Sequence, residues 1–115
     1  MHELALMTSL VERVCEIAGR EEAARIITIT VIRGELSGVI PEALTFCFDV
    51  CVAGTRAEGA RLEIREEAAA WSCRQCGAAC SIVEETVMPL CPACGSQDLE
   101  LKSGREFRLE SIEVE

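Results

Sequence analysis

Four cysteines of this chain form two matched pairs with the spacing of metal ligands. Cys73 and Cys76 are separated by two residues, as are Cys91 and Cys94, and a glycine follows each pair. Two intervening residues let one tight turn direct both sulfur atoms at a single ion, and the glycine permits the positive φ angle that closes the turn. Four thiolates around one ion leave no coordination position for a substrate, so the sequence predicts a structural zinc site.

The residues alone leave three other uses of these cysteines open: a pair of disulfides, an iron ion in the same tetrahedron, and a redox-active dithiol. Zinc is favoured because it is the usual intracellular occupant of tetrahedral sulfur sites. Cys80 is a fifth thiol near the first pair and could compete as a ligand. We expect it to pack as a small apolar residue, as we do for Cys15, Cys47 and Cys51.

The amino terminus carries a second group of metal donors. His2 is the only histidine, and its size should keep aminopeptidases from removing Met1. The Met1 amine, the His2 amide and the His2 imidazole can then close fused chelate rings in one plane, with Glu3 as a fourth donor. Planar nitrogen ligation suits Ni²⁺ and Cu²⁺ rather than Zn²⁺. A single histidine at a terminus is more often solvated and idle, so chemistry alone leaves both interpretations open.

The charge balance argues against nucleic acid as a partner. The 115 residues include 11 basic and 20 acidic side chains, for a formal net charge of −9. Residues 71–101 contain one base, Arg74, against four acids, and four thiolates around one Zn²⁺ leave further negative charge. Such a surface gives no counterion-release drive toward phosphate.

The first residues carry no basic lead, and Glu12 and Arg13 interrupt the first apolar run. No run approaches about 20 consecutive apolar residues, the length that a membrane span needs. We therefore expect a cytoplasmic protein without a membrane span, in which thiols stay reduced.

Two helices and three strands must position these sites. Residues 4–18 place apolar side chains at three- and four-residue spacing, which indicates a helix, and Pro41 begins a second helix over 41–52. The second helix has Leu44, Cys47, Phe48 and Cys51 on one side.

The first strand is expected over 26–33, where Ile27, Ile29 and Val31 alternate with threonines. The other strands are expected at 60–66 and 106–114. The apolar face changes across Glu110 and Ser111, which predicts a β-bulge.

These elements predict an α+β fold: two helices on a small three-stranded sheet, with an inserted four-cysteine zinc-ribbon module. The zinc-binding module is expected at 71–101. Residues 1–70 plus 102–115 are expected to form a discontinuous, nickel-binding α/β domain. The module has too few large apolar residues for a core of its own, so metal ligation should fold it.

The chain resembles the HypA/HybF family of hydrogenase nickel-incorporation proteins over essentially its whole length. The resemblance rests on the start MHELAL, the segments GELSGV and PEAL at 34–39 and 41–44, the two cysteine pairs, and the end SIEVE. It implies a nickel metallochaperone for [NiFe]-hydrogenase maturation, in some members also for urease. It further implies labile nickel at Met1, His2 and Glu3, and structural zinc at Cys73, Cys76, Cys91 and Cys94. The implied partners are a HypB-type maturation GTPase and the [NiFe]-hydrogenase large subunit.

Two positions depart from the family pattern. Some relatives have histidines beside the zinc cysteines, where this chain has Gly77-Ala78 and Gly95-Ser96, so a pH-switching zinc site is not expected here. Cys80 stands where an apolar, often aromatic residue is expected.

The alternative function is an acidic zinc-ribbon adaptor that binds only proteins and has no specific nickel site. An enzyme is not expected, because no phosphate-binding loop or nucleophile–base arrangement is visible.

Overall fold

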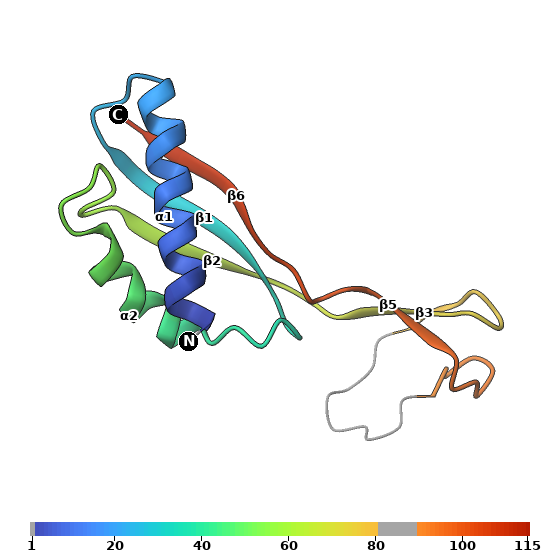
Figure 1. Cartoon of the computed structure of the whole chain (residues 1–115). Coiled ribbons are helices and arrows are strands. Elements are labelled where there is room, and N and C mark those ends of the chain that lie inside the picture. Colours follow the sequence, from blue (N-terminus) through green and yellow to red (C-terminus); the bar gives the residue numbers. More distant parts are fainter. Residues whose placement is uncertain (1, 81–89) are drawn as a thin grey trace.

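The computed structural model describes residues 2–80 and 90–115, which form two lobes joined end to end (Figure 1). Each lobe contains a three-stranded sheet, in the order β2-β1-β6 in the first and β4-β3-β5 in the second. No helix in these described ranges is long and apolar enough to cross a membrane. The elements are α1 (His2–Arg20), β1 (Ile26–Gly34), α2 (Pro41–Val52), β2 (Arg61–Glu67), β3 (Ala70–Cys73), β4 (Ala79–Cys80), β5 (Leu99–Ser103) and β6 (Phe107–Val114).

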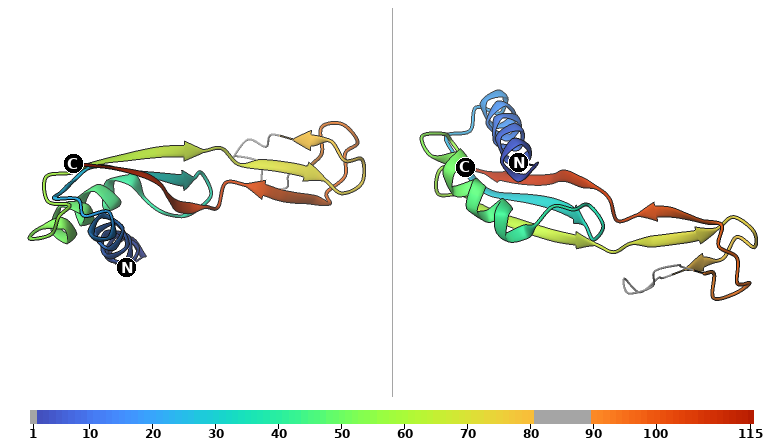
Figure 2. Two further views of the ribbon diagram at one scale, coloured as in Figure 1. Left: turned by 90° about the horizontal axis from the view of Figure 1, so that it is seen from above. Right: turned by 60° about the horizontal axis from the view of Figure 1, so that its bottom comes forward.

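The first lobe, here called the helical lobe, contains α1, α2 and the sheet β2-β1-β6. Central β1 pairs parallel with β2, which follows it through α2, and antiparallel with β6. Both helices lie on one face of this sheet (Figure 2). The predicted α+β fold, with two helices on a three-stranded sheet, is confirmed.

The core of the helical lobe lies between the helices and β1. Met7 and Val14 from α1, Leu44 from α2, and Ile29 and Val31 from β1 are all fully buried there. Burial of these aliphatic side chains removes them from water and fixes both helices on the sheet. One expectation for α1 was wrong: Leu4 is 41 % exposed, so the buried stripe begins only at Met7.

The β1 strand carries one irregularity that its alternating pattern concealed. Ile26 and Ile29 are both in the core, because the register with β6 shifts between Ile26 and Thr28. Ile27, which the alternating pattern groups with Ile29 and Val31, is only half-buried and is not part of that core. Because of this shift, the side chains that face the core change from even-numbered to odd-numbered positions after Ile26.

The predicted bulge in β6 is confirmed. Thr30 pairs with Ser111 and the next residue, Val31, pairs with Leu109, so the ladder skips Glu110. The extra residue lets Leu109 and Ile112 both pack on the helical core although they are three positions apart.

The second lobe, here called the cysteine lobe, contains β3, β4, β5 and their connections. It extends the molecule to principal-axis lengths of 55 × 26 × 17 Å, since β2 leads into β3 and β5 into β6 (Figure 2). Its strands were not predicted, because β4 has only two residues and β3 only four, too few for a side-chain period to emerge. The division at residues 71 and 101 stays a prediction.

Two glycines allow the chain segments to meet where the lobes join. The Gly34 N–H donates to the Glu106 carbonyl at 2.6 Å, and the Leu36 N–H donates to the Gly104 carbonyl at 2.6 Å. A Cβ atom on Gly34 would lie 2.2 Å from the Gly104 carbonyl oxygen. The close backbone approach at this junction therefore requires glycine.

Candidate metal centre

The four paired cysteines converge at the tip of the cysteine lobe. Their Sγ atoms all lie within 4.8 Å of one another, and no other cluster of three or more metal-ligating side chains occurs in residues 2–80 and 90–115. The Sγ atoms are 3.5 Å apart between Cys73 and Cys94 and 3.7 Å apart between Cys76 and Cys91. A zinc ion with four bonds of about 2.3 Å separates its sulfur ligands by about 3.8 Å. The sulfur cage therefore fits one tetrahedral zinc ion.

Each cysteine pair is held by the same backbone turn. The Gly77 N–H donates to the Cys73 carbonyl at 2.9 Å, and the Gly95 N–H donates to the Cys91 carbonyl at 2.7 Å. Both glycines have positive φ angles, 76° and 77°, as the spacing predicted. The turns aim the first sulfur of each pair inward and leave the second at the surface, because Cys73 and Cys91 are buried and Cys76 and Cys94 are exposed.

The turns also divide the thiols into two acid–base classes. Hydrogen bonds from the Cys94 and Ala93 N–H groups lower the pKa of Cys91 to about 6, although burial opposes them. For Cys94 the Ser96 N–H acts in the same direction, but hydrogen bonding to the Cys73 thiol and burial outweigh it and raise the pKa to about 12. Cys91 is thus ready to bind a metal ion as a thiolate, whereas Cys94 loses its proton only when a metal ion binds its sulfur.

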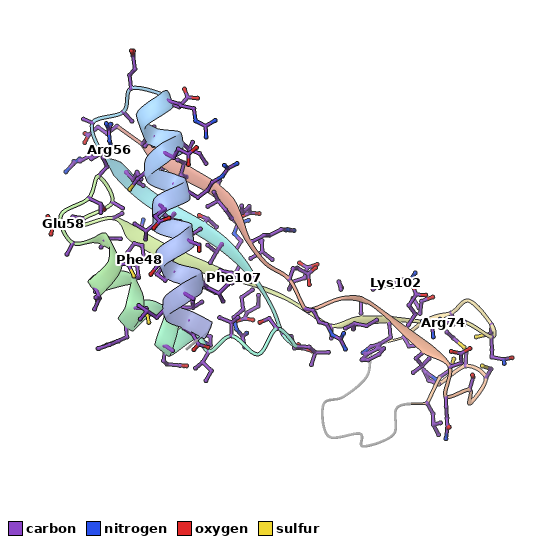
Figure 3. The ribbon with its side chains drawn as sticks, in the orientation of Figure 1. Phe48, Arg56, Glu58, Arg74, Lys102 and Phe107 are labelled. Carbon is purple, nitrogen blue, oxygen red and sulfur yellow. The ribbon has the colours of Figure 1, made fainter. Side chains whose placement is uncertain are left out.

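The surroundings of the cage are acidic. Arg74, the one basic residue between 71 and 101, lies at the same end of the lobe as the cysteine sulfurs (Figure 3). Its guanidinium pairs with Asp98 at 2.9 Å and with Glu100 at 3.4 Å, and Lys102 pairs with Glu100 at 2.5 Å. Because Arg74 and Lys102 are paired with these carboxylates, the two cations are poorly placed to bind phosphate.

The other cysteines pack as expected. Cys47 is buried in the helical core, and Cys15 and Cys51 lie half-buried against it. Cys80 is 6 % exposed and packs with Cys73 and Cys91. Sequence reasoning missed its contact with the cage: the Cys80 S–H donates to Cys91 Sγ at 3.8 Å. Spacing identified Cys80 only as a thiol near the first pair, because the contact itself depends on the pairing of β4 with β3.

The start of α1, at His2 and Glu3, belongs to the helical lobe, whereas the sulfur cage belongs to the cysteine lobe (Figure 1). Met1 is outside the described residues, and α1 begins at His2. The Glu3 carboxylate accepts a hydrogen bond at 3.3 Å from the N–H of Ile40, the residue that precedes α2. Glu3 thereby links the first turn of α1 to the start of α2. The described start of α1 and the four cage cysteines thus lie on different lobes.

Comparisons with known sequences give the chain a family. A family model described as "Hydrogenase/urease nickel incorporation, metallochaperone, hypA" matches residues 1–114. The chain is similar to the hydrogenase maturation factor HypA of Geobacter sulfurreducens, with 41% identity over the whole of both chains. It is 43% identical to the protein of that name from Nostoc, over all of this chain and 96% of the relative.

Solved structures show the same fold. The solution structure of a HypA protein superposes with a TM-score of 0.77, at 25% identity, over 99% of this chain and 96% of the other. The solution structure of the nickel metallochaperone HypA from Helicobacter pylori gives a TM-score of 0.65 at 24% identity, over 97% and 96% of the two chains. This chain therefore belongs to the HypA family of hydrogenase and urease nickel-incorporation metallochaperones.

Proposed function

We propose that this protein binds Ni(II) at its amino terminus and delivers it for the maturation of [NiFe]-hydrogenase or urease, without catalysis of its own. The observation that carries the proposal is the family match, which covers residues 1–114 and so includes both metal-donor groups. The start of α1 and the sulfur cage lie on different lobes, which supports separate roles for the two metals.

The nickel ligands in this proposal are the Met1 amine, the His2 amide and imidazole, and Glu3. These donors are consecutive at one chain end, so an acceptor can take the nickel ion by displacing one ligand at a time. The Glu3 hydrogen bond to Ile40 supports a defined position for this donor at the surface of the helical lobe. Planar nitrogen donors favour Ni²⁺. Cu²⁺ should nevertheless bind more tightly in vitro, because the Irving–Williams order of divalent-metal affinities places Cu²⁺ above Ni²⁺.

Zinc is proposed to be a permanent part of the cysteine lobe, held by Cys73, Cys76, Cys91 and Cys94. When bound, it supplies a crosslink between the two turns and no reactive position. The buried sulfurs of Cys73 and Cys91 and the backbone hydrogen bonds of both turns support this assignment. The protein would act in the cytoplasm, where the four thiols remain reduced.

The proposed partners are a HypB-type maturation GTPase and the [NiFe]-hydrogenase large subunit. Nucleic acid is not a proposed partner, since the net charge is −9 and Arg74 is paired with carboxylates. A micromolar, salt-sensitive affinity for DNA or RNA would contradict this part of the proposal.

Replacing His2 with alanine tests the nickel site. We expect His2→Ala to lose nickel binding in calorimetry and to keep its zinc, because only the imidazole donor is removed. Nickel affinity of the unchanged protein should weaken as pH falls toward 6, since the amine (pKa about 8) and imidazole (about 6.5) must lose protons to bind.

Cys94→Ala is the reciprocal control. It should lose zinc and retain nickel, because it changes only the sulfur cage. Unchanged nickel affinity in His2→Ala would contradict the proposal and leave the acidic zinc-ribbon adaptor as the better explanation.

A further inference from the structure

Cys80 lies beside the sulfur cage, in contact with one of its sulfurs, although it is outside the set of four. Its Sγ lies 3.8 Å from Cys91 Sγ, and the Sγ of Cys76 lies 3.7 Å from the same atom. Both separations match the edge of about 3.8 Å expected between two sulfur ligands of one zinc ion. Cys80 and Cys76 therefore approach Cys91 at equivalent distances.

The two thiols differ in exposure. Cys76 is exposed at the surface, whereas Cys80 is 6 % exposed and belongs to the same buried cluster as Cys73 and Cys91. Cys80 lies on β4, where it pairs with Trp71 of β3, the strand that ends at Cys73. Strand pairing therefore holds Cys80 beside the cage independently of the turn that carries Cys76.

We propose that Cys80 is a reserve ligand that replaces Cys76 on the zinc ion when Cys76 is lost from the site. The inference rests on the zinc assignment proposed above. In the exchange, the bond from zinc to the Cys76 sulfur breaks and a bond to the Cys80 sulfur forms, while Cys80 releases its S–H proton. If Cys76 is alkylated by a maleimide, its sulfur keeps the new S–C bond and the maleimide carbon takes up a proton. If Cys76 is oxidised by a peroxide, it becomes a sulfenic acid and the hydroxide released takes up the proton as water. Four thiolates remain on zinc in both cases.

Cys76 is the exposed ligand whose replacement we consider, because its Sγ and the Sγ of Cys80 lie at nearly equal distances, 3.7 and 3.8 Å, from Cys91 Sγ. Cys94 is the other exposed ligand, and its Sγ lies 3.5 Å from Cys73 Sγ. An alkylating reagent or a peroxide reaches exposed Cys76 before buried Cys80. The reserve thiol would keep the cysteine lobe metallated after such damage.

The test compares three variants of the full chain. We expect Cys76→Ala to keep one zinc with affinity reduced about tenfold, and Cys76→Ala/Cys80→Ala to bind about a hundredfold more weakly again. Cys76→Ala/Cys15→Ala is the matched control, because it removes a thiol of the helical lobe, and it should equal Cys76→Ala. With Co²⁺ in the site, the thiolate-to-cobalt bands should retain four-thiolate intensity in Cys76→Ala and fall in the double variant.

A second measurement uses proteins with all four primary ligands. Treated with one equivalent of N-ethylmaleimide, zinc-loaded Cys80→Ala should release zinc about tenfold faster than the unchanged protein. Equal zinc affinities for Cys76→Ala and Cys76→Ala/Cys80→Ala, or equal release rates, would overturn the reserve role. Absence of zinc from the unchanged protein would instead overturn the zinc assignment itself.

Discussion

The two lobes are stabilised by different means. The helical lobe has a continuous core to which α1, α2 and all three strands of its sheet contribute. In the cysteine lobe the buried apolar cluster consists of Cys73, Cys80 and Cys91, with Trp71, Ala78 and Leu99 partly buried against it. Because the buried members of this cluster are all small, little apolar area is available to offset the entropy of folding. We infer that zinc ligation folds the cysteine lobe and that packing folds the helical lobe.

Cys73→Ala should give the largest effect, because it removes one of the two buried ligands of the cage. We expect zinc affinity to fall at least about a hundredfold and the cysteine lobe to unfold, since ligation free energy is folding free energy there. Fluorescence of Trp71, the only tryptophan, should report the change. Retained zinc by elemental analysis, or unchanged fluorescence on chelation, would contradict the inference that zinc ligation folds the cysteine lobe.

Leu44→Ala makes the opposite change. Leu44 is fully buried between the helices and the sheet, so its truncation should cost about 2–5 kcal/mol of unfolding free energy. Urea denaturation followed by far-UV circular dichroism measures that loss. The folded variant should still contain one zinc per chain, and zinc loss under native conditions would indicate that the lobes do not fold separately.

Much of the helical lobe could be predicted from sequence, because its apolar side chains have the spacing of the elements that bury them. The bounds of α2 and the bulge at Glu110 were both predicted correctly for this reason. The half-burial of Ile27 could not be predicted, because a bulge at the strand start looks like regular alternation in the sequence.

In the cysteine lobe the sequence predicted the four converging ligands but not the strands. Ligand spacing reports local turns, whereas the pairing of β3 with β4 and β5 is a non-local backbone property. The alternation in β5 involves only two apolar residues, Leu99 and Leu101, which is too short to identify a strand. The contact of Cys80 with Cys91 depends on that pairing and could not be predicted from spacing alone.

Gly34→Ala examines the junction between the lobes. The added Cβ would lie 2.2 Å from a backbone oxygen of Gly104, so the segments must separate, at a cost of about 3 kcal/mol. Gly38→Ala is the matched control: its φ is +77° with nothing within 4 Å, so only backbone strain of about 1 kcal/mol is added. Equal thermal stabilities for the two variants would show that close approach at Gly34 is unimportant.

The proton count of zinc binding gives a smaller effect. At pH 7, Cys91 is already mostly ionised because its pKa is about 6, whereas Cys94, with a pKa of about 12, is protonated. Zinc binding should therefore release fewer than four protons, and affinity should fall as pH falls. Calorimetry in buffers of different ionisation enthalpy measures this number, and release of four protons would contradict the lowered pKa of Cys91.

The most direct test of a labile nickel site on one lobe and a fixed zinc site on the other is to add one residue before Met1. The extension converts the proposed amine ligand into an amide, and it leaves the cysteine lobe unchanged. Nickel and zinc should then be measured on the same preparation, by calorimetry and by elemental analysis. We predict that nickel binding is lost while one zinc per chain remains. Unchanged nickel affinity, or loss of both metals together, would contradict the account.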